Sequence, residues 1–177
     1  MNTYSVRKND KYGFINKEGI EVIPLIYDAT QNFHEGYARV VKNGKYGFIN
    51  KEGIEVIPCI YDWVGIFNEG YVCVRKNGKC GFINKEGKEI ISCIYDFNIN
   101  NYNFLEGYAV VIKNDKFGFI NKEGKEVIPC IYDYDGDREL ISSIYEFVFD
   151  FHESYVGVIK NGKSGFINKN GVEYWED

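Results

Sequence analysis

Nine residues recur five times along this 177-residue chain, and the repetition limits the fold more than any other feature. The copies follow the pattern K-x-G-F-I-N-K-x-G and begin at Lys11, Lys45, Lys79, Lys116 and Lys163. Self-similarity at a period of about 20 to 50 residues is typical of arrays in which each repeat is one supersecondary unit. The sequence therefore predicts a single repeat domain over 1–177.

The spacing of the repeated glycine shows where the units are regular. Gly13, Gly47 and Gly81 are each 34 residues apart, and Gly118 and Gly165 follow after 37 and 47 residues. The final interval contains a second copy of a strand sequence, because EVIPCIYD is echoed 13 residues later by ELISSIYE. We therefore expect units at approximately 1–36, 37–70, 71–107, 108–154 with the strand duplication, and 155–177 as a capping unit.

Each unit carries the signals of a three-stranded antiparallel meander. The segments 37–41 and 46–50 flank Asn43-Gly44, and a two-residue Asn-Gly loop favours a hairpin because both positions accept positive φ. The turn 51–53 ends in glycine and leads to a third strand at 54–58. These signals predict an all-β protein.

The register set by the hairpin turn predicts how the units meet. Ala38 is expected to pair with Ile49, and Val40 with Gly47, so both faces of the meander are largely apolar. A meander cannot cover both faces alone, and each unit must pack on its neighbours. We therefore expect a curved, solenoid-like array, with a five-bladed β-propeller as the alternative. We further expect Gly47 to leave room for an aromatic ring of an adjacent unit.

The full motif resembles a known family. K-x-G-F-I-N-K-E-G is followed by E-V-I-P, I-Y-D and F-x-E-G-Y-A-x-V, which is similar to the bacterial WG repeat (KWG repeat) family over nearly the whole chain. The tryptophan of the family is replaced here by Tyr12, Tyr46, Cys80, Phe117 and Ser164. The resemblance implies a β-repeat module of the kind used for binding.

Composition limits the classes of partner. The net charge of -5 argues against nucleic acid and anionic membranes, which select basic surfaces. The first ten residues, MNTYSVRKND, contain no apolar leader, and we expect a cytoplasmic protein. Three of the five cysteines (Cys59, Cys93 and Cys130) occupy one repeat position, which favours buried thiols over disulfides. Cys73 and Cys80 are expected to be diagonal neighbours across a hairpin.

The sequence contains no convergent set of catalytic groups. His34 and His152 both occupy the variable position of F-x-E-G, so a catalytic or ligand role is not expected for either. The aspartates after each I-Y are expected to accept backbone hydrogen bonds in turns (Asp28, Asp62, Asp96 and Asp133). We predict no enzyme activity, no catalytic residue, no cofactor and no metal site.

Lysines flank every hairpin turn and would form rows in a stacked array. We predict a non-catalytic scaffold for protein-protein interaction, with a lysine row meeting an acidic partner. The alternative is a multivalent small-ligand or glycan binder that uses equivalent aromatic sites. The oligomeric state is left open. The candidate partner-binding residues are Lys42, Lys45, Lys76, Lys79, Lys113, Lys116, Lys160 and Lys163.

Overall fold

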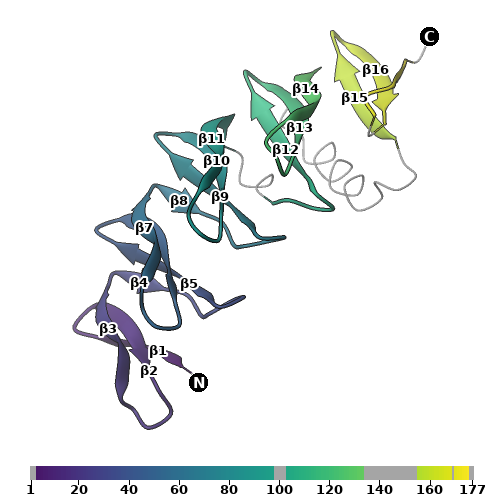
Figure 1. The fold of residues 1–177 in the computed structure, drawn as a ribbon. Coiled ribbons are helices and arrows are strands. Elements are labelled where there is room, and N and C mark those ends of the chain that lie inside the picture. The colour runs from purple at the N-terminus through teal and green to yellow at the C-terminus, as the bar shows by residue number, and fades with distance from the viewer. Residues whose placement is uncertain (1–2, 98–102, 134–154, 169, 176–177) are drawn as a thin grey trace.

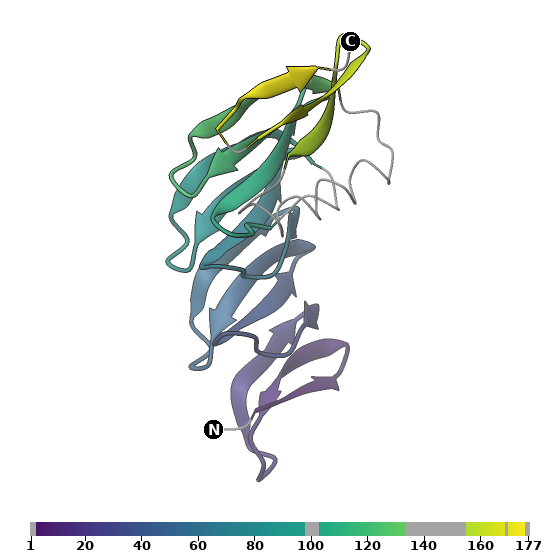
Figure 2. The same cartoon turned by 90° about the vertical axis from the view of Figure 1, so that its right-hand side faces the viewer.

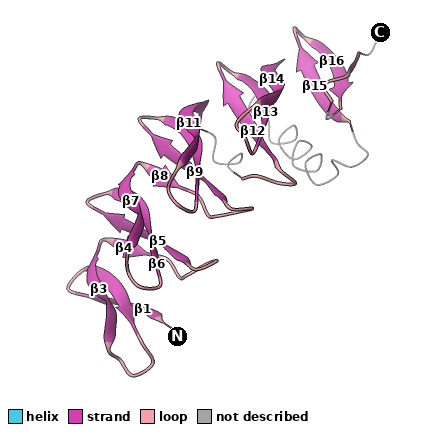
Figure 3. Ribbon diagram, in the orientation of Figure 1, coloured by secondary structure: helices cyan, strands magenta, loops and turns pink. Residues whose placement is uncertain are grey.

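The structure, a computed structural model, describes residues 3–97, 103–133, 155–168 and 170–175. In these residues the chain forms five small antiparallel sheets that follow one another along an arc (Figure 1). All of their regular structure is strand (Figure 3), and none of them belongs to a helix that could cross a membrane. The all-β repeat array is therefore confirmed.

The sheets, numbered 1 to 5 from the N-terminus, contain 17 strands within the described residues. Sheet 1 contains β1 (Tyr4–Lys8), β2 (Lys11–Ile15) and β3 (Glu21–Tyr27). Sheet 2 contains β4 (Ala29–Thr30), β5 (Tyr37–Lys42), β6 (Lys45–Asn50) and β7 (Glu55–Tyr61). Sheet 3 contains β8 (Trp63–Val64), β9 (Tyr71–Lys76), β10 (Lys79–Asn84) and β11 (Glu89–Asp96). Sheet 4 contains β12 (Tyr108–Lys113), β13 (Lys116–Asn121) and β14 (Glu126–Asp133), and sheet 5 contains β15 (Val156–Lys160), β16 (Lys163–Ile167) and β17 (Glu173–Trp175).

The turns have the backbone conformations that the sequence predicts. Asn43 and Gly44 both have positive φ, 52° and 72°, as a two-residue hairpin loop requires. In the second turn the side chain of Asn50 accepts hydrogen bonds from the N–H groups of Glu52 and Ile54. Such a side-chain bond reproduces a backbone turn, which explains why the asparagine of GFIN recurs.

The strand register is confirmed, but the role of the repeated glycine differs from the expectation. Ala38 pairs with Ile49 and Val40 with Gly47. A Cβ placed on Gly47 would lie 2.5 Å from the carbonyl oxygen of Ile57, which belongs to the third strand of the same sheet. The third strand is bulged here, so that its backbone passes directly over the glycine. The space therefore admits neighbouring backbone, and no ring of an adjacent unit occupies it.

Two connections between units contribute more to the sheets than a three-stranded meander requires. The short strand β4 pairs with β5, and β8 pairs with β9, so that sheets 2 and 3 each have a fourth strand. Both strands directly follow the I-Y-D motif of the preceding unit. Each connection therefore adds an edge strand to the next sheet, and a sheet begins earlier in the sequence than the repeat pattern suggests.

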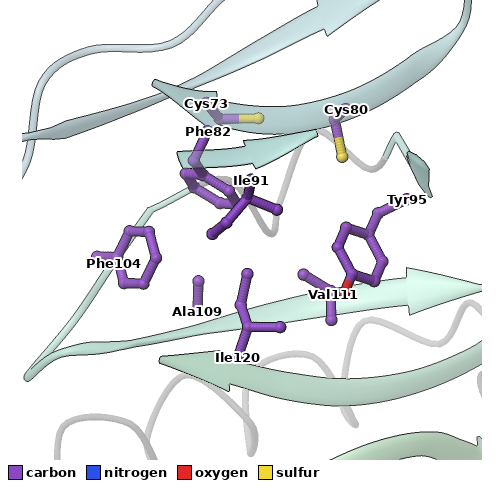
Figure 4. Packing of buried hydrophobic residues seen from close by; sticks show 9 residues of the cluster. All are labelled: Cys73, Cys80, Phe82, Ile91, Tyr95, Phe104, Ala109, Val111 and Ile120. Carbon is purple, nitrogen blue, oxygen red and sulfur yellow. The ribbon is translucent and has the colours of Figure 1, made fainter. Parts of the chain in front are cut away.

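Four buried clusters join the five sheets, one cluster at each junction. At the junction of sheets 3 and 4, Phe82 and Tyr95 of sheet 3 face Val111 and Ile120 of sheet 4 (Figure 4). The other clusters repeat this arrangement, with aromatic and isoleucine side chains on one side and small or β-branched side chains on the other. Each sheet between the ends of the array therefore buries one face against each of its neighbours.

The array is open, and it does not close into the five-bladed propeller of the alternative. The two ends of the chain lie at opposite ends of the arc, and a view turned by 90° shows the same separation (Figure 2). The expected duplicated strand at 139–146 lies outside the described residues.

Candidate interaction surfaces

Five of the eight candidate lysines form ion pairs, and three of these pairs join the same two repeat positions. Lys45, Lys79 and Lys116 each pair with the aspartate that follows I-Y, which is Asp62, Asp96 or Asp133. Lys11 pairs with Asp28 in the same way. These lysines are therefore engaged by the protein itself.

The same aspartates connect each sheet to the next hairpin. Asp62 accepts a hydrogen bond of 2.7 Å from the backbone N–H of Asn77, in the first turn of sheet 3. Asp96 likewise accepts one of 2.9 Å from the N–H of Asn114 in sheet 4. The prediction that these aspartates accept backbone bonds is confirmed, and the bonds they accept join consecutive units.

We expect the array to lose stability in acid because of these carboxylates. The hydrogen bond from the paired lysine is the main cause that holds the pKa of Asp28, Asp62, Asp96 and Asp133 below the ordinary value of 3.8. A lowered pKa in the folded state gives stability that is present above the unfolded pKa and is lost as the pH falls through the folded pKa. The melting temperature, measured by circular dichroism from about pH 7 to about pH 2, should therefore fall mainly below about pH 4.

The control for this prediction is the Asp62→Asn variant, whose amide does not titrate. It should melt at a lower temperature than the wild type at neutral pH, and the difference between the two should shrink in acid. A difference that stays constant down to about pH 2 would contradict the assigned role of the carboxylate.

The remaining candidate lysines differ among themselves. The Nζ of Lys42 lies 3.7 Å from Glu55. Lys160 lies 3.0 Å from Glu173 and over the ring of Trp175. Beside Lys160, a shallow hollow of about 360 Å³ is lined by Lys160, Asn161, Lys163 and Trp175. In the part of the chain that the structure describes, Lys76, Lys113 and Lys163 are exposed and form no ion pair within 4.0 Å. The role of the lysines in partner binding stays a prediction. These three lysines could bind an acidic partner without breaking an ion pair within the described residues.

The glutamate of one F-x-E-G loop, Glu69, provides a further link between units. Glu69 has a positive φ of 50°, which is uncommon for glutamate. Its carboxylate accepts hydrogen bonds from the N–H groups of Glu106 and Gly107 and pairs with Lys122 at 3.0 Å. Burial alone would raise the pKa of Glu69, but these hydrogen bonds outweigh it and lower the pKa. Glu69 therefore links the loop before β9 in sheet 3 to the two turns of sheet 4 that contain Glu106 and Lys122.

The three repeated thiols are half-buried, less than the sequence predicted, because they lie on the edge strand of each sheet (Cys59, Cys93 and Cys130). Burial raises the pKa of Cys59 and of Cys93 to about 11, and that of Cys130 to about 12. A thiol that remains protonated at neutral pH is a poor nucleophile. Cys73 is opposite Phe82, and Cys80 is opposite Arg75, as predicted for diagonal neighbours, and all five cysteines are free thiols.

An exposed row of isoleucines was not predicted. The isoleucine of each I-Y-D motif is 37–48% exposed, whereas the tyrosine after it is buried. The four residues lie on the third strands, which pair with a neighbour on one side only. Those strands (β3, β7, β11 and β14) follow one another along one side of the arc (Figure 1). We call this row the isoleucine stripe: Ile26, Ile60, Ile94 and Ile131.

The structure places the other candidate positions in unequal environments. At the site of the family tryptophan, Tyr12 and Tyr46 are half-buried under Arg7 and Arg39, respectively. Phe117, at the same site, is fully buried. His34 is exposed in a loop, and His152 lies outside the described residues. Among the described residues, no three metal-ligating side chains come together.

The comparisons with known proteins agree with the geometry of the repeats. A family model described as WG containing repeat matches five segments, 12–46, 46–80, 81–117, 117–134 and 137–163. The chain belongs to the WG repeat family. The first four segments begin at or next to the variable residue of K-x-G. Each of the first three includes the second and third strands of one meander and the first strand of the next. The comparison with curated proteins finds no match.

Proposed function

We propose that this WG repeat array is a non-catalytic scaffold that binds another protein along the isoleucine stripe. The observation that carries the proposal is the periodic exposure of one isoleucine in each of the first four units. Exposed apolar side chains that gather in one area often mark interaction sites, whereas scattered ones need no explanation. Because the stripe repeats with the units, it suits a partner that is extended along the array.

The surroundings of the stripe favour contacts between side chains over pairing of strands. The exposed prolines of the third strands (Pro24, Pro58 and Pro129) precede the isoleucines by two residues. Proline provides no backbone donor and thereby protects a sheet edge from an added strand. A partner would therefore place apolar side chains against the stripe, and Lys76 and Lys113, which form no ion pair with the described residues, would contribute charge.

The alternative of a multivalent glycan binder finds less support. Such a binder needs aromatic side chains with equal exposure at equivalent positions. At the position of the family tryptophan, one aromatic residue is fully buried, two are half-buried under arginines, and the others are Cys80 and Ser164. Equal sites are not available there.

The test compares two kinds of isoleucine substitution. The stripe variant is Ile60→Ser combined with Ile94→Ser. The control is Ile20→Ser combined with Ile54→Ser, because these residues are 61% and 60% exposed and lie outside the stripe. Each protein would be used to capture partners from a lysate of the source cell, and affinities would be measured with the partner found. We expect the stripe variant to bind at least about tenfold more weakly, since each lost contact costs on the order of 1 kcal/mol.

The outcomes distinguish the candidate surfaces. Equal binding by the stripe variant and the wild type would exclude the stripe. A Lys76→Glu, Lys113→Glu variant tests the lysines in the same assay. Loss of binding in that variant alone would assign the interaction to the lysine row.

A further inference from the structure

Every junction between sheets has two different sides. The preceding sheet contributes phenylalanine, isoleucine and tyrosine, as Phe48, Ile57 and Tyr61 do in sheet 2. The following sheet contributes smaller side chains from its first two strands, as Val74 and Ile83 do in sheet 3. We call the first kind of surface the aromatic face and the second kind the aliphatic face. Each sheet has one of each.

The aromatic face of sheet 5 is open. Phe166 is 44% exposed, whereas the equivalent phenylalanines of the other four sheets are at most 3% exposed. Tyr174, which pairs with Phe166 across the strands, is also exposed, and its ring contacts the exposed ring of Tyr155. The aliphatic face of sheet 5 is already occupied, because Val158 and Ile167 pack into the junction with sheet 4. Sheet 5 therefore presents one half of a junction.

The aliphatic face of sheet 1 is open as well. Tyr4 is 52% exposed, and Val6, Ile15 and Leu25 are half-buried. Ile15 is opposite Tyr4 in the register, as Ile49 is opposite Ala38 in sheet 2. In sheets 2 to 4 the residues equivalent to Tyr4 and Ile15 are at most 1% exposed. Sheet 1 therefore presents the complementary half of a junction.

We propose that two copies of the chain associate head to tail, with the aromatic face of sheet 5 in one copy packed on the aliphatic face of sheet 1 in the other. The four internal junctions show how these two kinds of face fit together. The two faces lie at opposite ends of an open arc, so a copy that binds at one end leaves its other end free (Figure 1). A contact of this heterologous kind extends into chains of copies unless the rotation closes a ring.

The association should be weak. Only one face of a three-stranded sheet would be buried in each copy, whereas a standard stable interface buries roughly 800 Å² per partner. The larger Tyr4 also replaces the small alanine or valine of the internal junctions, so the packing cannot be as close. In addition, the net charge of -5 opposes self-association at low ionic strength. We expect dissociation constants between about 10 µM and about 1 mM.

Sedimentation equilibrium of the full chain at about 0.15 M salt tests this proposal. The weight-average mass of the wild type should rise more than twofold between about 1 µM and about 1 mM. Two variants each block one end. Phe166→Glu places a charge on the aromatic face, and Val6→Glu places one on the aliphatic face. Tyr4→Glu is a second variant of the aliphatic face at a residue that is already exposed, and circular dichroism verifies the fold of each.

The decisive measurement mixes the two blocked variants. Each should remain monomeric alone, and the equimolar mixture should approach twice the monomer mass and rise no further, because only one pair of intact ends is available. A wild-type chain that stays monomeric over the whole range overturns the proposal. A Val6→Glu variant that still dimerises alone also overturns it, since the contact would then join two aromatic faces. A mixture of the two blocked variants that stays monomeric would overturn the proposal as well.

Discussion

Replacement of Gly81 by alanine should strongly destabilise the array. A Cβ at this position would lie 2.3 Å from the carbonyl oxygen of Ile91 and 2.6 Å from the carbonyl carbon of Ser92. Both are backbone atoms of the bulged third strand, so relief requires the strand to move and its hydrogen bonds to weaken. We expect a loss of about 3 kcal/mol or more in the free energy of unfolding.

Gly157→Ala is the control for this exchange. Gly157 also lies in a strand, but a Cβ there would have no neighbour within 4 Å. Alanine should be neutral or slightly stabilising at that position, because glycine loses more conformational freedom on folding. For a chain of this size, the melting temperature of Gly81→Ala should fall by roughly 6–12 °C, with almost no change for Gly157→Ala. Similar melting temperatures for the two variants would contradict a steric role of the repeated glycine.

The second large effect is expected at the phenylalanine of GFIN and depends on the unit in which it lies. Phe82 is 1% exposed in the junction of sheets 3 and 4. Its ring packs against that of Phe104, with 4.8 Å between the ring centroids (Figure 4). Phe82→Ala removes this ring from a packed cluster and should cost about 3–5 kcal/mol. Phe166 occupies the same place in the motif but is 44% exposed, and Phe166→Ala should cost less than about 1 kcal/mol.

Urea unfolding at a concentration of about 1 µM, where copies of the chain do not associate, measures both effects. If Phe82→Ala does not fold, Phe82→Leu provides a milder change at the same site. Equal losses at the two positions would mean that junctions contribute little to stability, and the account of the array would then be wrong. Unequal losses would show that the same motif stabilises the protein only where another sheet covers it.

The sequence predicted the hairpins because their determinants are local. Asn43-Gly44 sets the turn, the turn sets the register, and the register places Ala38 opposite Ile49. The repetition then predicted the array, because a motif written five times performs the same structural role in each place. These steps require no knowledge of contacts between distant residues.

The isoleucine stripe was missed because the third strand was expected to span 54–58, and that expectation was wrong. The strand β7 runs from Glu55 to Tyr61 and therefore includes the isoleucine and tyrosine of I-Y-D. Burial alternates along its second half, so that Ile60 is exposed between two more buried neighbours, although its apolar side chain alone would not predict exposure. The lysine pairs were missed for a different reason, since Lys45 and Asp62 are 17 residues apart and meet only because the third strand returns beside the second.

The bonds from each aspartate to the next hairpin have a mechanical consequence. Asp62 reaches Asn77 and Asp96 reaches Asn114, so these ties span only 15 and 18 residues of the chain. Under tension applied to its two ends, such a molecule can unfold one sheet at a time, because the hydrogen bonds between the remaining sheets stay intact. Its length would then increase in steps, and its length without tension would depend on the number of repeats.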